Sequence, residues 1–112
     1  MTSKTLADIM TRQIAEVASD TPLGEAAERM GRANSEVLLV IDKTEPIGFF
    51  TEHNLLLSLQ RGLAPQTPVK DLLITPLVKA AQFLDYRAGH RLMTQANVGH
   101  LLVVDIDGRP AG

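Results

Sequence analysis

The chain has 112 residues, long enough for one ordinary domain or two very small ones, and with 45% hydrophobic and 21% charged residues it has the composition of a globular protein. A net charge of -2 disfavours nucleic acid and anionic lipid surfaces as partners. The lack of cysteine excludes disulfides, thiolate zinc sites and thiol nucleophiles, and no apolar run resembles a signal peptide or is long enough to span a bilayer. We therefore expect a cytoplasmic protein.

The first elements are a short helical turn, a strand and an amphipathic helix. The helical turn is predicted at residues 5–10 and the strand at residues 14–17. Thr21 is the predicted cap of the helix and Pro22 its first residue. One stripe of this helix is apolar and is expected to pack on a sheet: Leu23, Ala26, Ala27 and Met30.

A hairpin and a second helix follow. Residues 37–41 are branched and apolar without alternation, which predicts a strand buried on both faces. A polar turn at residues 42–46 and an apolar run at residues 47–50 complete an antiparallel hairpin. Thr51 is expected to cap a helix that reaches about Arg61. Backbone N–H donors and the positive end of a helix dipole meet at such a junction, so it is a place for an anion.

The most informative feature of the sequence is an internal repeat with a spacing of 63 residues. The register holds without a gap, and these residues coincide: Asp8 with Asp71, Met30 with Met93, Ala33-Asn34 with Ala96-Asn97, Leu38-Leu39-Val40 with Leu101-Leu102-Val103, and Asp42 with Asp105. Two copies of one supersecondary unit therefore describe the chain better than one irregular domain. We assign residues 1–62 to the first repeat, 63–68 to a linker and 69–112 to the second repeat.

The second repeat follows the first with differences. Thr67 and Pro68 are predicted to start a short helix, and a strand is expected at residues 77–78. The amphipathic helix of this repeat carries Gly89 and His90 on its stripe, which we interpret as divergence from the first repeat.

The second repeat also ends early. After a predicted strand at residues 101–104 and a tight turn at residues 107–108, Ala111-Gly112 align with Ile47-Gly48 if the turn holds one extra residue. The second repeat then lacks most of its third strand and all of its last helix. We expect the chain to be a fragment of a longer polypeptide with an effector domain beyond Gly112.

The repeated pattern resembles the CBS domain family. The stretches that carry the resemblance are LADIMT at residues 6–11, TPLGEAAERM at 21–30, VLLVID at 37–42 and IGFFTEHN at 47–54. The resemblance implies an α+β fold in which two β-α-β-β-α repeats pack with pseudo-two-fold symmetry as a tandem pair, or Bateman module, the second repeat lacking its last helix. Many members bind ATP, ADP, AMP or S-adenosylmethionine between the repeats and signal to another domain.

The resemblance also implies a set of site residues. In such relatives the last strand ends Gly-x-x-Thr/Ser-x-x-Asp; Gly48 and Thr51 match, and Asn54 stands where aspartate is expected. The amide keeps an acceptor oxygen but loses a charge-assisted bond to ribose, which is roughly twice as strong as a neutral one. The candidate nucleotide-binding residues are Thr51, Asn54, His53, Thr11, Arg12, Ala15 and Val37.

Every candidate except Thr11 has a plainer alternative. Thr51 and Asn54 have the spacing of a helix cap and its partner, and His53 and Arg12 suit solvated surface positions. Ala15 and Val37 suit the core.

No catalytic or metal-binding pattern stands out. The serines lack a recognisable nucleophile motif, and His53, His90 and His100 share no metal-ligand spacing. We therefore expect no enzyme activity, no metal and no required cofactor. The leading hypothesis is a homodimeric signal-transduction module that binds an adenosine-containing small molecule and controls a downstream cyclic-dinucleotide enzyme, metabolic enzyme or transporter. The alternative is a dimerisation scaffold without a ligand.

Overall fold

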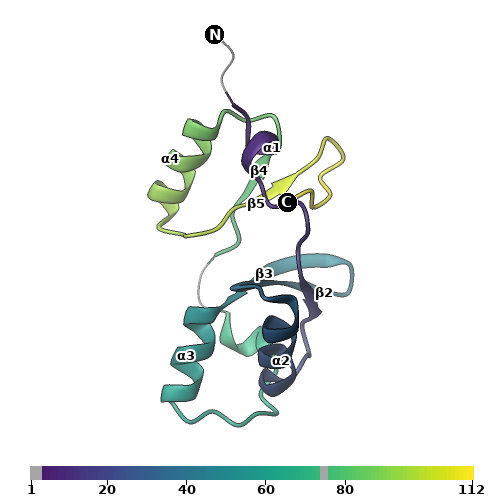
Figure 1. Ribbon diagram of the computed structural model, residues 1–112, viewed down its shortest axis with the longest axis vertical. Helices are drawn as coiled ribbons and strands as arrows, with labels where there is room; N and C mark the ends of the chain where they lie inside the picture. Colours follow the sequence, from purple (N-terminus) through teal and green to yellow (C-terminus); the bar gives the residue numbers. More distant parts are fainter. Residues whose placement is uncertain (1–3, 74–75) are drawn as a thin grey trace. The chain divides into compact units, whose positions relative to one another are not determined.

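The computed structural model describes residues 4–73 and 76–112 and has the expected mixed α+β fold (Figure 1). The first three residues of the polar N-terminus lie outside these ranges. The elements in chain order are α1 (Leu6–Ile9), β1 (Glu16–Ala18), α2 (Leu23–Ala33), β2 (Val37–Asp42), β3 (Glu45–Thr51), α3 (Glu52–Gln60), the 3-10 helix η1 (Val69–Leu72), β4 (Lys79–Ala81), α4 (Tyr86–Ala96) and β5 (Leu102–Val104).

These elements form two compact units. The hairpin unit is Ala15–Thr75, and the terminal unit combines Met1–Ile14 with Pro76–Gly112. Each unit therefore contains its own sheet and its own long amphipathic helix. The units do not follow the repeat boundaries at residues 62 and 69, which stay a prediction about the sequence repeat.

The sheet of the hairpin unit has the order β1-β2-β3. β1 is parallel to β2, with Val17 opposite Val40, and β2 is antiparallel to β3, with Val37 opposite Thr51. The hairpin was predicted, but its turn is shorter than the predicted residues 42–46. Asp42 pairs with Glu45, so the strands continue almost to the tip. β1 begins at residue 16 instead of the predicted 14.

The core of the hairpin unit lies between the sheet and α2. Leu38, Val40 and Phe50 are fully buried in one cluster, to which α2 contributes Leu23, Ala26 and Met30. Leu39 faces the opposite side of the sheet by strand alternation, and it is also fully buried. This confirms the prediction that β2 is covered on both faces.

The start of α2 differs from the prediction. The helix begins at Leu23, so Pro22 is the flanking residue, and no Thr21 side chain caps it. The Leu23 N–H donates to the carbonyl of Thr67 at 2.8 Å, and the next N–H along the helix donates to the carbonyl of Pro65 at 3.0 Å. The predicted linker therefore supplies the acceptors that every helix N-terminus needs.

Two boundaries in the second repeat also differ from their predictions. Pro68 occupies the flanking position predicted for Thr67, and the short helix after it is the 3-10 helix η1. The strand predicted at residues 77–78 begins at Lys79.

The terminal unit has a sheet of β4 and β5, which are parallel, with Ala80 opposite Val103. The chain then returns along β5: the Ala111 N–H donates to the Val103 carbonyl at 2.7 Å, and the Val103 N–H donates to the Gly112 carbonyl at 2.8 Å. Gly108, with a φ of 80°, closes a three-residue turn that accommodates the extra residue. The predicted alignment of Gly112 with the glycine of the first hairpin is confirmed, since that glycine pairs with the residue equivalent to Val103.

Several elements reproduce the sequence repeat. The bounds of α2 and α4, of β1 and β4, and of α1 and η1 each differ by 63 residues. The strand pairing of Val17 with Val40 recurs as that of Ala80 with Val103. These paired elements therefore share one arrangement.

The opening helices of the two repeats are exchanged between the units. In the hairpin unit the N–H of Val69, in η1, donates to the carbonyl of Thr21 at 2.9 Å. In the terminal unit the N–H of Leu6, in α1, donates to the carbonyl of Leu84 at 2.9 Å. Figure 1 shows α1 beside β4 and α4, although the opposite ends of the chain form them. Each unit is thus completed by the opening helix of the other repeat.

This exchange explains Gly89. A Cβ at Gly89 would lie 2.7 Å from Cδ2 of Leu6, whereas the equivalent pair in the hairpin unit is Ala26 and Val69, both fully buried in one cluster. Leu6 on α1 is larger than its equivalent Val69, and Gly89 on α4 is smaller than its equivalent Ala26. The divergence at Gly89 therefore has a physical reason, because this glycine makes room for Leu6.

The Leu6–Gly89 contact predicts a rescue experiment. Gly89→Ala gains about 1 kcal/mol of helix propensity but forces a methyl group against the Leu6 side chain, so its free energy of unfolding should lie about 1–3 kcal/mol below that of Gly31→Ala. The double substitution Gly89→Ala with Leu6→Val copies the pair of the hairpin unit and should recover most of this loss. Urea denaturation measures both. Gly31→Ala, at a helix position where a Cβ meets nothing within 4 Å, is the control and should not destabilise. An equal change in stability in Gly89→Ala and Gly31→Ala would contradict the packing argument.

The composition of the hairpin unit predicts how fragments behave. A fragment of residues 15–73 keeps the buried Val69 and the linker carbonyls that cap α2, whereas a fragment of residues 1–62 loses both. The first should be more stable by at least about 2 kcal/mol, the value of burying one aliphatic side chain. Circular dichroism during urea denaturation compares them, and greater stability of residues 1–62 would show that η1 is dispensable.

Candidate functional site

One edge of the sheet in the hairpin unit gathers five of the seven candidate residues. Val37 begins β2 and lies opposite Thr51, the last residue of β3. His53 and Asn54 follow in the first turn of α3, and Ala15 directly precedes β1, the neighbour of β2. The antiparallel hairpin therefore brings the start of β2 together with the start of α3.

Thr51 and Asn54 form a reciprocal helix cap. The Asn54 N–H donates to Thr51 Oγ1 at 3.2 Å, while the Thr51 N–H and hydroxyl donate to Asn54 Oδ1 at 2.9 and 2.8 Å. The arrangement satisfies two N–H groups that have no partner within the helix. The capping role is confirmed, and contact of Thr51 with a ligand stays a prediction.

Asn54 is buried, with 5% of its surface exposed. Its Nδ2 donates to the carbonyl of Leu72 at 3.5 Å, at the end of η1. Below it, the Ser58 hydroxyl donates to the Asn54 carbonyl at 2.8 Å. An aspartate would offer no donor to Leu72. The departure from the expected aspartate was visible in the sequence, but the partner was not, because it lies 18 residues away.

The other residues of this edge provide different chemistry. His53 is exposed at the positive end of α3, which favours contact with negative charge. Ala15 and Val37 are half-buried apolar side chains, and Ala15 packs against the core cluster of the hairpin unit. The edge therefore combines a hydroxyl, an imidazole and apolar side chains, a set suited to a molecule with both polar and flat apolar parts.

Thr11 and Arg12 belong to the terminal unit rather than to this edge of the hairpin unit. Both are exposed, and Arg12 Nη2 donates to the carbonyl of Ala7, in α1, at 3.0 Å. At the start of α1, hydrogen bonds from the Thr5 backbone N–H and then the Thr5 hydroxyl lower the pKa of Asp8. The Asp8 carboxylate thus accepts hydrogen bonds at the start of α1, and the Arg12 guanidinium, just beyond the end of α1, donates to the backbone of the helix.

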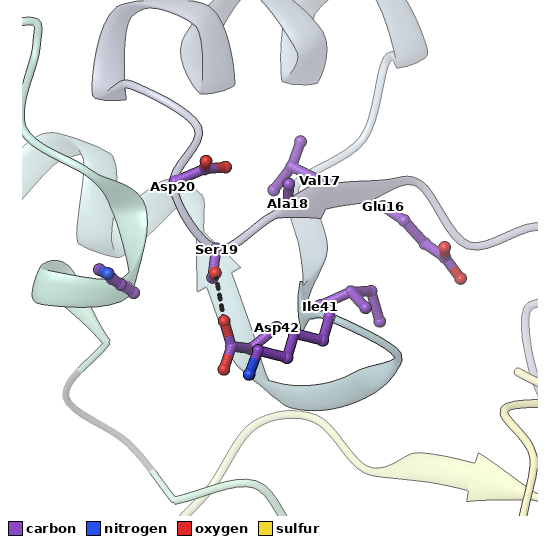
Figure 2. Close-up of a pocket in the computed structure, with 9 residues that line it drawn as sticks. Glu16, Val17, Ala18, Ser19, Asp20, Ile41 and Asp42 are labelled. Atoms are coloured by element: carbon purple, nitrogen blue, oxygen red, sulfur yellow. Dashed lines mark hydrogen bonds between the residues drawn. The ribbon is translucent and has the colours of Figure 1, made fainter.

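A pocket that the sequence reasoning missed lies at the other end of β2 (Figure 2). Its volume is about 620 Å³, and its lining residues are Glu16, Val17, Ala18, Ser19, Asp20, Ile41, Asp42, Lys43 and Lys70. Ser19 is 7% exposed, and its hydroxyl donates to Asp42 Oδ1 at 2.7 Å. The available signal was that polar residues follow two adjacent strands, but their parallel pairing was needed to bring them together.

The Ser19–Asp42 hydrogen bond has a structural role. It ties the turn after β1 to the end of β2, and the Ser19 carbonyl accepts from the N–H of Lys70 at 3.1 Å. The hydroxyl donates to a carboxylate, and no histidine is among the described residues that line the pocket. The arrangement therefore holds two turns and η1 together.

Within residues 4–73 and 76–112, no three His, Cys, Asp or Glu side chains come together in a group that could hold a metal ion. Within the same ranges no helix has the length and apolar character needed to cross a membrane.

Comparison with known proteins adds the following. A model of the CBS domain family matches residues 6–61. The CBS domain-containing protein YhcV of Bacillus subtilis is 29% identical over 99 residues, which cover 88% of this chain and 71% of that protein.

Two solved structures with low sequence identity share the fold. The CBS domain protein PAE2072 from Pyrobaculum aerophilum, complexed with AMP, has a TM-score of 0.85 and 14% identity, covering 96% of this chain and 84% of that one. The CBS domain pair of protein MJ0100, in complex with 5′-methylthioadenosine and S-adenosyl-L-methionine, has a TM-score of 0.84 and 18% identity, covering 99% and 88%.

Proposed function

This chain belongs to the CBS domain family, and on that premise we propose that it is a regulatory module that senses an adenosine-containing small molecule. The observation that carries the proposal is the junction of β3 and α3. There the Thr51 hydroxyl stands at a helix N-terminus, next to an exposed imidazole and two half-buried apolar side chains. Proteins that share the fold have been solved with AMP and with S-adenosyl-L-methionine, which supports an adenosine compound as the ligand.

We assign roles by chemistry. Thr51 bonds the ribose or a phosphate, and His53 meets a phosphate at the positive end of α3. Ala15 and Val37 provide an apolar wall for adenine. Asn54 belongs to the site because it holds Thr51 in place.

The terminal unit supplies the remaining proposed contacts. Thr11 bonds the base or the ribose, and the guanidinium of Arg12 exchanges its bond with the Ala7 carbonyl for a phosphate. These roles require the two repeats to form a tandem pair with the ligand in the cleft between them, as the resemblance implies.

The proposal extends to the whole protein. As a cytoplasmic homodimer, the module passes the ligand state to an effector domain without catalysing a reaction itself. Ligand binding biases an effector only if the ligand prefers one arrangement of the pair.

A second candidate function is a dimerisation scaffold without a ligand. Two observations favour it. Thr51 and Asn54 satisfy each other without any ligand, and α3 exposes 52% of Leu56 and 61% of Leu59. Leucines three positions apart lie on the same side of a helix and suit contact with a partner helix.

Ligand binding distinguishes the two functions. Thermal unfolding and calorimetric titration are carried out with AMP, ATP, S-adenosylmethionine and 5′-methylthioadenosine. At a hundredfold excess over its dissociation constant, a ligand adds about 2.7 kcal/mol to the free energy of unfolding, which raises the melting temperature of a protein of this size by about 10 °C. No response to any of the four compounds would favour the scaffold.

Substitution of Thr51 tests the site directly. Thr51→Val removes the hydroxyl and the cap, so it should cost about 1 kcal/mol of stability and abolish the ligand-induced rise in melting temperature. The rise is measured from the ligand-free midpoint of each variant. Thr51→Ser keeps the hydroxyl and should keep the rise. Thr94→Val, which removes a hydroxyl bonded to the His90 carbonyl in α4, is the control. An undiminished rise in Thr51→Val would remove Thr51 from the site.

A further inference from the structure

The junction of β3 and α3 also holds the end of η1, at two points. Asn54 Nδ2 donates to the carbonyl of Leu72 at 3.5 Å. Leu73 packs against the bare backbone of Gly48, where a Cβ would lie 3.0 Å from Leu73 Cδ1. The glycine and the asparagine that flank Thr51 in the sequence motif therefore both face the segment that begins the second repeat.

The glycine contact recurs in the terminal unit. Met10, 63 residues before Leu73, packs against Gly112, where a Cβ would lie 2.6 Å from the Met10 sulfur. The packing of a large apolar side chain against a glycine is thus common to both units.

The other end of η1 is held by the turn between β1 and α2. The N–H of Val69 donates to the Thr21 carbonyl at 2.9 Å, and the N–H of Lys70 donates to the Ser19 carbonyl at 3.1 Å. A four-residue 3-10 helix has little stability of its own. These backbone hydrogen bonds and the Asn54 hydrogen bond together therefore determine whether η1 stays packed in the hairpin unit.

The acceptor oxygen of the Asn54 side chain is already committed. Its Oδ1 accepts two hydrogen bonds from Thr51, which uses both lone pairs of the carbonyl oxygen, and its Nδ2 donates to Leu72. With 5% of its surface exposed, the side chain has no free acceptor for a ribose hydroxyl. An aspartate would have acceptors to spare and no donor for the Leu72 carbonyl.

We propose that Asn54 is a positioning residue that connects the Thr51 hydroxyl to the packing of η1 within the hairpin unit, and that it does not bind ribose. The ligand half of this inference rests on the proposed function. A ligand that forms a hydrogen bond with the Thr51 hydroxyl would replace its bond to Asn54 Oδ1. The same Asn54 carboxamide donates to the Leu72 carbonyl, so this second bond would be affected too. Because such a coupling acts in both directions, the packing of η1 and ligand binding at Thr51 then affect each other.

The first experiment needs no ligand. Asn54→Asp keeps the acceptor for Thr51 but lacks the donor for Leu72, and amide hydrogen exchange by NMR reports each end of η1. The N–H groups of Val69 and Lys70 should exchange about fivefold faster, as expected for the loss of one hydrogen bond. The capped N–H of residue 54 should be unchanged. Asn97→Asp, the same substitution at the end of α4, is the control and should leave Val69 and Lys70 unchanged.

Two results would overturn the link to η1. One is unchanged exchange at Val69 and Lys70 in Asn54→Asp. The other is an equal acceleration across β2 and β3, because that would mean a general loss of stability rather than the release of η1.

The second experiment tests the ribose. Dissociation constants of AMP and 2′-deoxyadenosine monophosphate are measured for the wild type and for Asn54→Ala, with Asn54→Ser in reserve if the alanine variant does not fold. We expect the ratio of the two constants to agree within about twofold between wild type and variant. If Asn54 bound ribose, the ratio would change by about fivefold or more, the usual effect of one hydrogen bond.

The outcomes separate this inference from the proposed function. A lack of AMP binding by the wild type would contradict that function for AMP and remove the ligand half of the inference. The exchange experiment would still decide whether Asn54 holds η1.

Discussion

The structure depends on the exchange of the opening helices. Both α1 and η1 have only four residues, far too few for a helix that is stable alone. Each finds its backbone partners in the turn that follows the first strand of the other repeat, as the Val69–Thr21 and Leu6–Leu84 hydrogen bonds show. Neither sheet unit is complete without this contribution, because Val69 is part of the buried core of one and Leu6 of the other.

This constraint also organises the candidate site. The segment that completes the hairpin unit ends against the junction of β3 and α3, where Thr51 caps the helix and Asn54 contacts Leu72. The sheet edge that we propose as the adenosine site is therefore the same place that contacts the start of the second repeat. In the regulatory module that we propose, a ligand that bonds Thr51 would act on the second repeat through the Asn54–Leu72 hydrogen bond.

Much of the fold could be predicted from the sequence, because the 63-residue repeat and the apolar patterns report local structure directly. The hairpin, the Thr51 cap and the pairing of Gly112 with β5 followed from such patterns. The misses have a common cause. The start of α2 is set by the carbonyl of Thr67, the glycine at position 89 by Leu6, and the role of Asn54 by Leu72, and each partner is distant in the chain.

The most direct test of the exchanged packing is the pattern of nuclear Overhauser effects at the two opening helices. The exchanged packing predicts cross-peaks from the Leu6 methyl groups to the α-protons of Gly89, and from the Val69 methyl groups to the methyl group of Ala26. Cross-peaks from Leu6 to Ala26 and from Val69 to Gly89 would place each opening helix on its own repeat and would contradict the account.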